Sequence, residues 1–163
     1  MTLPARSPSA QTRTFTFLFT DIQGSTRLWE EHPEAMRPSL ARHDAILRAA
    51  IEGHGGHVFK TIGDAFCAAF EQPEQAVAAA AEAQRELQTG AWEGGGPLRV
   101  RMALHTGPAE VREGDYFGPA LNRVARLLAA AHGGQIVLTQ ATREALAGRS
   151  PRRWSCVSWA GTA

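Results

Sequence analysis

The chain has 163 residues, of which 44% are hydrophobic and 20% charged, with a formal net charge of +1. These values are typical of one soluble globular domain with a sizeable core. The near-zero charge offers no field that would attract nucleic acid or an anionic membrane, and no apolar run reaches the length of a membrane span. Two cysteines are too few for a disulfide framework, and the first residues carry no secretory signal, so we expect a cytoplasmic protein.

Hydrophobic periodicity and turn residues predict strands and helices in alternation along the chain. The predicted strands are 14–21, 57–62, 65–70, 98–106, 109–113 and 135–139. The predicted helices begin at Pro38, at Pro73, at Gly118 and after residue 139, the last one ending near Leu146.

Two turns organise this pattern. Gly63-Asp64 fits a two-residue hairpin between the second and third strands, and Gly107-Pro108 is expected to break the fourth strand. The order predicts an α+β fold: a ferredoxin-like, mixed or antiparallel sheet with helices packed on one face. We expect a disordered lead-in over 1–13, a catalytic domain over 14–147 and a C-terminal tail over 148–163.

Two aspartates each follow or precede a predicted strand at a turn. Asp21 ends the first strand, and Asp64 lies at the tip of the hairpin. If these strands are neighbours, both carboxylates reach one edge of the sheet, where such a pair can bind two divalent cations for chemistry at phosphorus. An isolated aspartate in either place is more commonly a helix cap or a turn residue.

Other polar residues accompany this pair. Lys60 precedes Asp64 by four residues, Arg101 lies on the fourth strand, and Asp115 precedes a predicted helix. On that helix Asn122 and Arg126 are four residues apart and project to one side. Each of these residues alone is also compatible with a solvated surface position.

Together these segments resemble the catalytic domain of the class III nucleotidyl cyclases, the adenylyl and guanylyl cyclases. The matching segments are FTDIQGST (19–26), KTIGD (60–64), VRMALHTG (100–107) and DYFGPALNRVAR (115–126). The resemblance covers about residues 14–147, and the compact DYFGP stretch is similar to a shorter-armed bacterial subset.

The resemblance implies a role for each matched polar residue. Asp21, the main chain of Ile22, and Asp64 would bind two divalent cations, Mg²⁺ or Mn²⁺, and Lys60 and Asp115 would read the base. The remaining implied roles are orientation of the ribose by Asn122, stabilisation of the transition state by Arg126, and phosphate contacts by Gln23, Gly24, Ser25, Thr26 and Arg101.

The base-reading pair favours adenine. Adenine offers an acceptor at N1 and a donor at N6, which a lysine donor and an aspartate acceptor complement, whereas guanine reverses that pattern. If Lys60 and Asp115 converge on the base, the expected activity is an adenylyl cyclase. It would convert ATP to 3′,5′-cyclic AMP and pyrophosphate by two-metal-ion catalysis.

The resemblance also implies a homodimer. Lys60 and Asp64 lie on one short hairpin, yet they would serve opposite ends of a nucleotide. The family resolves this with a head-to-tail dimer, in which one subunit supplies the aspartates and the other supplies Lys60, Asp115, Asn122 and Arg126. Two equivalent sites would then be shared across a two-fold axis, with no role for nucleic acid.

Other functions fit parts of the pattern. These are a catalytically weak nucleotide-binding regulatory domain, a guanylyl cyclase, and a palm-type polymerase or diguanylate cyclase, whose GGDEF-like turn is absent. The full set of matched residues favours an enzyme. The C-terminus departs from the family, because Lys60 is the chain's only lysine and the expected triphosphate-binding lysine is missing; Arg152 or Arg153 is a candidate replacement.

Overall fold

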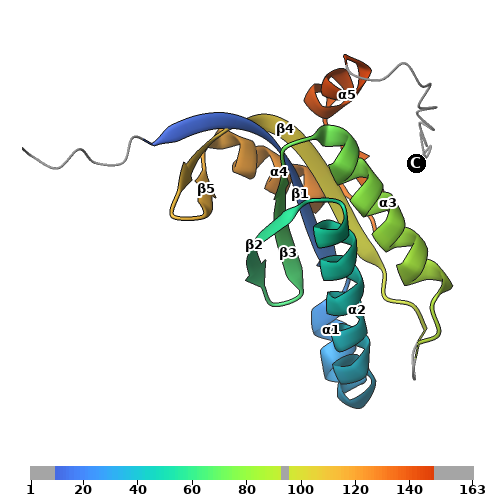
Figure 1. Cartoon of the computed structure of the whole chain (residues 1–163). Helices are drawn as coiled ribbons and strands as arrows, with labels where there is room; N and C mark the ends of the chain where they lie inside the picture. The colour runs from blue at the N-terminus through green and yellow to red at the C-terminus, as the bar shows by residue number, and fades with distance from the viewer. Residues whose placement is uncertain (1–9, 93–95, 149–163) are drawn as a thin grey trace, which may run out of the picture.

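The computed structural model describes residues 10–92 and 96–148 (Figure 1). The elements in chain order are β1 (Gln11–Ile22), α1 (Ser25–Glu31), α2 (Pro33–Gly53), β2 (His57–Ile62), β3 (Ala65–Phe70), α3 (Pro73–Thr89), β4 (Val100–Arg112), β5 (Asp115–Phe117), α4 (Pro119–Ala130), β6 (Ile136–Leu138) and α5 (Gln140–Ala147). Strand β1 thus begins within the segment expected as a lead-in. Most of the expected C-terminal tail, including Arg152 and Arg153, lies outside the described residues.

The six strands form one mixed sheet in the order β2-β3-β1-β4-β5, with β6 also paired to β4. Every pair is antiparallel except β4 with β6, which is parallel. The predicted α+β class is confirmed. The β2–β3 hairpin has the predicted bounds, and because Thr20 lies opposite Phe66, its turn lies at the same end of the sheet as the end of β1.

Alternate residues of β1 divide the core into two clusters. Leu18 and Ile22 pack with residues of α2 and α3, which lie side by side in Figure 1, and we call this side the α2/α3 face. Phe15 and Phe17 pack with Val124 of α4 on the opposite side, the α4 face. The expectation that all helices lie on one face was therefore wrong, because β1 is apolar on both sides and each side needs a cover.

The start of α2 also differs from the prediction. The helix begins at Pro33 and contains Pro38, which was expected to be its first residue. Pro33 occupies the first turn, where the missing N–H costs nothing. Met36, only 2% exposed, packs in the core and holds the first turn helical despite the proline that follows.

Strand β4 was expected to break at Gly107-Pro108 but runs unbroken across it. Gly107 lies opposite Phe15 and Pro108 opposite Thr14 of β1. On its other side β4 pairs with β6 and β5 only at 102–104 and 110–112, so Pro108 lies where that side has no partner strand. A proline is tolerated at such a position because no ladder hydrogen bond is lost.

None of the helices in the described residues is long and apolar enough to cross a membrane.

Candidate functional site

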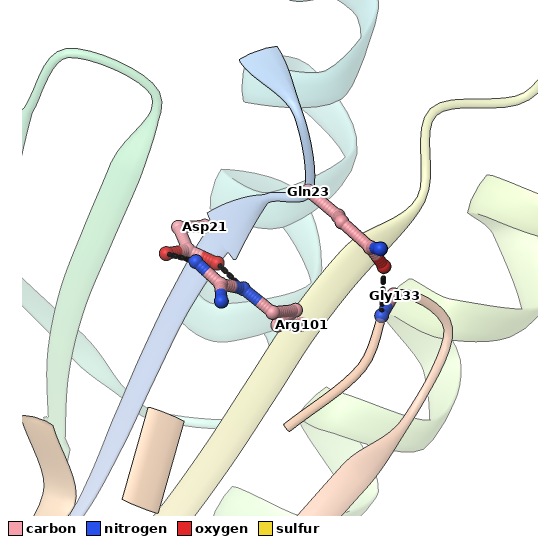
Figure 2. Close-up of polar contacts among 4 residues, drawn as sticks. All are labelled: Asp21, Gln23, Arg101 and Gly133. Atoms are coloured by element: carbon pink, nitrogen blue, oxygen red, sulfur yellow. Dashed lines mark hydrogen bonds and ion pairs between the residues drawn. The ribbon is translucent and has the colours of Figure 1, made fainter. Parts of the chain in front are cut away.

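Asp21 is held by Arg101 on the neighbouring strand. The two residues are directly opposed in the β1–β4 register, on the α4 face. Arg101 donates from Nε to Oδ1 at 2.6 Å and from Nη2 to Oδ2 at 2.5 Å, as Figure 2 shows. These hydrogen bonds raise the pKa of the Arg101 guanidinium, and the negative charge of Asp64 acts in the same direction. The charge of Arg101 therefore interacts favourably with the charges of both aspartates.

Asp64 occupies the hairpin turn as predicted. Gly63 precedes it with a φ of 58°, a conformation that glycine adopts without strain, so the turn directs Asp64 to the end of the sheet. Oδ2 of Asp64 is buried and accepts no hydrogen bond from the described residues. A buried carboxylate oxygen without a donor suits a cation ligand.

The donor set fits hard divalent cations only in part. Within residues 10–92 and 96–148 no group of three or more His, Cys, Asp or Glu residues could hold a metal ion. Asp21 and Asp64 are two carboxylates at this end of the sheet. Mg²⁺ commonly uses one or two carboxylates and takes its remaining ligands from water and substrate phosphates, so this pair is compatible with it.

The turn after β1 contains the residues that are expected to contact phosphates. Gly24 has a φ of 70° and precedes α1, whose first-turn N–H groups have no intrahelical acceptors. Gln23 is already engaged: its N–H donates to Arg99 O at 2.8 Å, and its Oε1 accepts from Gly133 N at 2.5 Å (Figure 2). Ser25 and Thr26 remain predictions, whereas Gln23 anchors the turn to the loop before β6.

Lys60 and Asp115 lie on strands β2 and β5, which contact one another although they are far apart in the chain. Lys60 is directly opposed to Cys67, whose side chain is 6% exposed. Burial raises the pKa of the Cys67 thiol to about 11, Lys60 lowers it and Asp115 raises it. The rings of their sequence neighbours Phe59 and Tyr116 lie 4.7 Å apart between centroids, so the two residues implied to read the base belong to one region of the α4 face.

Asn122 and Arg126 lie on the exposed side of α4. Within the part of the chain that the structure describes, neither side chain makes a hydrogen bond or an ion pair. Their spacing of one helical turn points both to the same side, as the sequence predicted. Both side chains are therefore exposed and unengaged in the single chain.

Two features of this site were not anticipated from the sequence. The register shifts between Val58 and Lys60, so Phe59 is an extra residue in β2. Tyr116, in the short strand β5, contacts Phe59 with ring centroids 4.7 Å apart. A bulge leaves no composition signal, and a three-residue strand is too short for periodicity to reveal.

The profile of the adenylate and guanylate cyclase catalytic domain matches residues 8–157. An uncharacterized protein of Mycobacterium tuberculosis is 42% identical over 142 residues, covering 86% of this chain and 47% of that protein. An adenylate cyclase of Lachancea kluyveri is 35% identical over 147 residues, covering 75% of this chain and 8% of that protein. The chain therefore spans less than half the length of these curated relatives.

Solved structures of the same kind are also similar. One is a Trypanosoma brucei adenylate cyclase described in its monomeric state, with a TM-score of 0.77 and 28% identity, covering 86% of this chain and 78% of that one. Another is an adenylate/guanylate cyclase/hydrolase from Silicibacter pomeroyi, with a TM-score of 0.73 and 26% identity, covering 88% of this chain and 85% of that one.

Proposed function

We propose, because this chain belongs to the adenylate and guanylate cyclase catalytic-domain family, that it converts ATP to 3′,5′-cyclic AMP and pyrophosphate. In this reaction the 3′-oxygen of the ribose bonds to the α-phosphorus and gives up its proton. The bond from that phosphorus to the bridging oxygen breaks, and pyrophosphate leaves with the electron pair.

The observation that carries the choice of ATP is the contact between β2 and β5, the strands that carry Lys60 and Asp115, with the neighbouring rings of Phe59 and Tyr116 4.7 Å apart. A lysine donor facing adenine N1 and an aspartate acceptor facing the N6 amino group satisfy both groups at once. Guanine would place an acceptor at the aspartate and a donor at the lysine. Each mispaired buried polar group costs about 1–3 kcal/mol, so two such groups support a clear preference for ATP.

Asp21 and Asp64, with the main chain of Ile22, would hold two Mg²⁺ or Mn²⁺ ions. Bound there, such ions supply a lowered pKa for the attacking hydroxyl and charge neutralisation for the leaving group. The buried, unpartnered Oδ2 of Asp64 supports this assignment. Arg101, beside both aspartates, would contact the β- and γ-phosphates once the nucleotide is bound.

The remaining chemistry would come from a second copy of the chain. Arg126 would place its guanidinium against the charge that develops on the phosphorus, and Asn122 would orient the ribose. Both side chains are exposed and unengaged in the single chain, which supports a homodimer with sites shared across a two-fold axis. Gly24, Ser25 and Thr26 would add main-chain donors to the triphosphate.

The test is an assay of the purified chain with Mn²⁺ and either ATP or GTP, with detection of the cyclic nucleotide. The proposal expects cyclic AMP from ATP and far less product from GTP. Cyclic GMP as the main product would make the protein a guanylyl cyclase and would overturn the base assignment. Binding of ATP with no turnover under any metal condition would overturn the activity in favour of a nucleotide-binding regulatory domain.

A further inference from the structure

The contact between β2 and β5 needs an explanation beyond the strand order. Lys60 lies on β2 and Asp115 on β5, which are the two ends of the order β2-β3-β1-β4-β5. At about 4.8 Å between neighbouring strands, a flat sheet would separate β2 from β5 by roughly 19 Å. Yet both charges act on the thiol of Cys67, and β5 contacts β2.

An aromatic cluster on the α4 face brings the two ends together. The ring of Tyr116 lies 4.7 Å from that of Phe59, 5.0 Å from that of Phe15 and 5.6 Å from that of Phe17, measured between centroids. The contacts with Phe15 and Phe17 are edge-on, which is a favoured geometry for aromatic pairs. In Figure 1 the β4–β5 hairpin accordingly bends toward the side of the sheet where β2 lies.

The bulge in β2 directs Lys60 toward this cluster. Val58 is opposed to Ala68 and packs on the α2/α3 face, whereas Lys60 is opposed to Cys67 on the α4 face. In a regular strand, residues two apart share a face, so Lys60 would follow Val58 to the α2/α3 face. The extra residue Phe59 breaks the alternation and turns Lys60 over, as bulges beside functional sites do.

The two rings thus sit next in sequence to the two base-reading residues: Phe59 precedes Lys60, and Tyr116 follows Asp115. We propose that Phe59 and Tyr116 are positioning residues whose ring contact sets the spacing between Lys60 and Asp115 and thereby the selectivity between ATP and GTP. This inference rests on the proposed function, since it concerns the base-reading half of the same site. It assigns no contact with substrate to either ring.

The first experiment compares kcat/KM for ATP and GTP in the full chain. Phe59→Ala and Tyr116→Leu should each lower the ATP:GTP ratio by at least about ten-fold, mainly through a higher KM for ATP. Tyr116→Phe keeps the ring and should keep the ratio. Phe70→Leu removes a buried ring on the α2/α3 face and controls for general loosening, so it should lower stability without changing the ratio.

A second measurement does not depend on turnover. Lys60→Cys and Asp115→Cys are combined with Cys67→Ala and Cys156→Ser, and the two new thiols are joined with a short bifunctional maleimide. The cross-link should form readily and should slow several-fold when Phe59→Ala is added. If the cross-link slows in this way and the parent chain makes no cyclic nucleotide, the ring contact is upheld while the proposed function fails.

The opposite result is equally informative. Cyclic AMP formation with an unchanged ATP:GTP ratio in both Phe59→Ala and Tyr116→Leu would uphold the proposed function and overturn the positioning role. A cross-linking rate that does not respond to Phe59→Ala would also overturn it.

Discussion

Arg101 donates to both carboxylate oxygens of Asp21, at 2.6 and 2.5 Å, across the β1–β4 pair. The Arg101 and Asp21 side chains are 27% and 21% exposed, so the pair is only partly solvated. Both oxygens that a cation would bind are thus engaged by a guanidinium. A divalent ion at Asp21 would therefore compete with the guanidinium for these oxygens and be repelled by its positive charge.

This competition predicts that Arg101→Gln binds Mn²⁺ more tightly than the parent chain when no nucleotide is present. A partly exposed ion pair is worth about 1 kcal/mol, so we expect roughly five-fold tighter binding. Free Mn²⁺ measured by electron paramagnetic resonance reports the affinity directly. Arg99→Gln alters an exposed neighbouring arginine and should leave the affinity unchanged; a weaker affinity in Arg101→Gln would contradict the competition.

Arg101→Gln should nevertheless convert ATP more slowly, because the proposed contact of Arg101 with the triphosphate is lost. Loss of a charged hydrogen bond costs about 1.5–3 kcal/mol, or roughly ten- to hundred-fold in kcat/KM. Tighter metal binding together with slower catalysis would separate the two roles of Arg101, since general damage to the site would weaken both.

Shared sites predict complementation between inactive variants. Asp64→Ala removes an acidic residue and Arg126→Ala removes a residue of the opposite half, so each homodimer should be inactive. Random exchange makes half of the dimers mixed, each with one intact site, and should restore about a quarter of the parent activity. Mixing Asp21→Ala with Asp64→Ala damages the same half twice and is the matched control; equal recovery in both mixtures would refute the shared site.

Base selection predicts that Lys60→Met loses preference for ATP. Methionine keeps much of the apolar stem but removes the donor, which should lower kcat/KM for ATP by roughly ten- to hundred-fold, while GTP is affected much less. Thr61→Ala, at an exposed neighbouring position, is the control. If the ATP:GTP ratio stays at its parent value in Lys60→Met, then Lys60 does not read the base.

The sequence predicted the elements whose patterns are long or strongly marked. The β2–β3 hairpin, with glycine at its turn, has the predicted bounds, and α3 and α4 begin at or within one residue of their predicted starts. Two prolines mark predicted boundaries that the structure does not have. Helix α2 continues through Pro38 because Met36 packs in the core, and β4 continues through Pro108, which pairs with Thr14 of β1.

The candidate site shows a similar division. Motif spacing identified Asp21 and Asp64, and the fold brings both to one end of the sheet. What the sequence could not show was the bulge at Phe59 and the contact of its ring with Tyr116, which joins β2 to β5. Such contacts form between residues distant in the chain and leave no periodic signature.

His105 gives the last prediction, a pH dependence of stability. The side chain is 4% exposed on β4, and its Nδ1 lies 2.8 Å from Thr139 Oγ1. Burial lowers its pKa, and the positive charge of Arg123 acts in the same direction. The fold therefore favours the neutral ring, whereas the unfolded chain takes up a proton near pH 6.5.

Between the folded and unfolded pKa values the unfolded state binds more protons, so stability rises with pH in that window. The contribution of His105 is complete above about pH 6.5 and is lost as the pH falls toward the lowered folded value, by about 1.4 kcal/mol for each unit between the two pKa values. Urea unfolding at about pH 7.5 and about pH 5 should show this loss in the parent chain and a smaller loss in His105→Gln. His132→Gln, at an exposed position, should keep the parent dependence, and an identical loss in all three proteins would exclude His105 as its source.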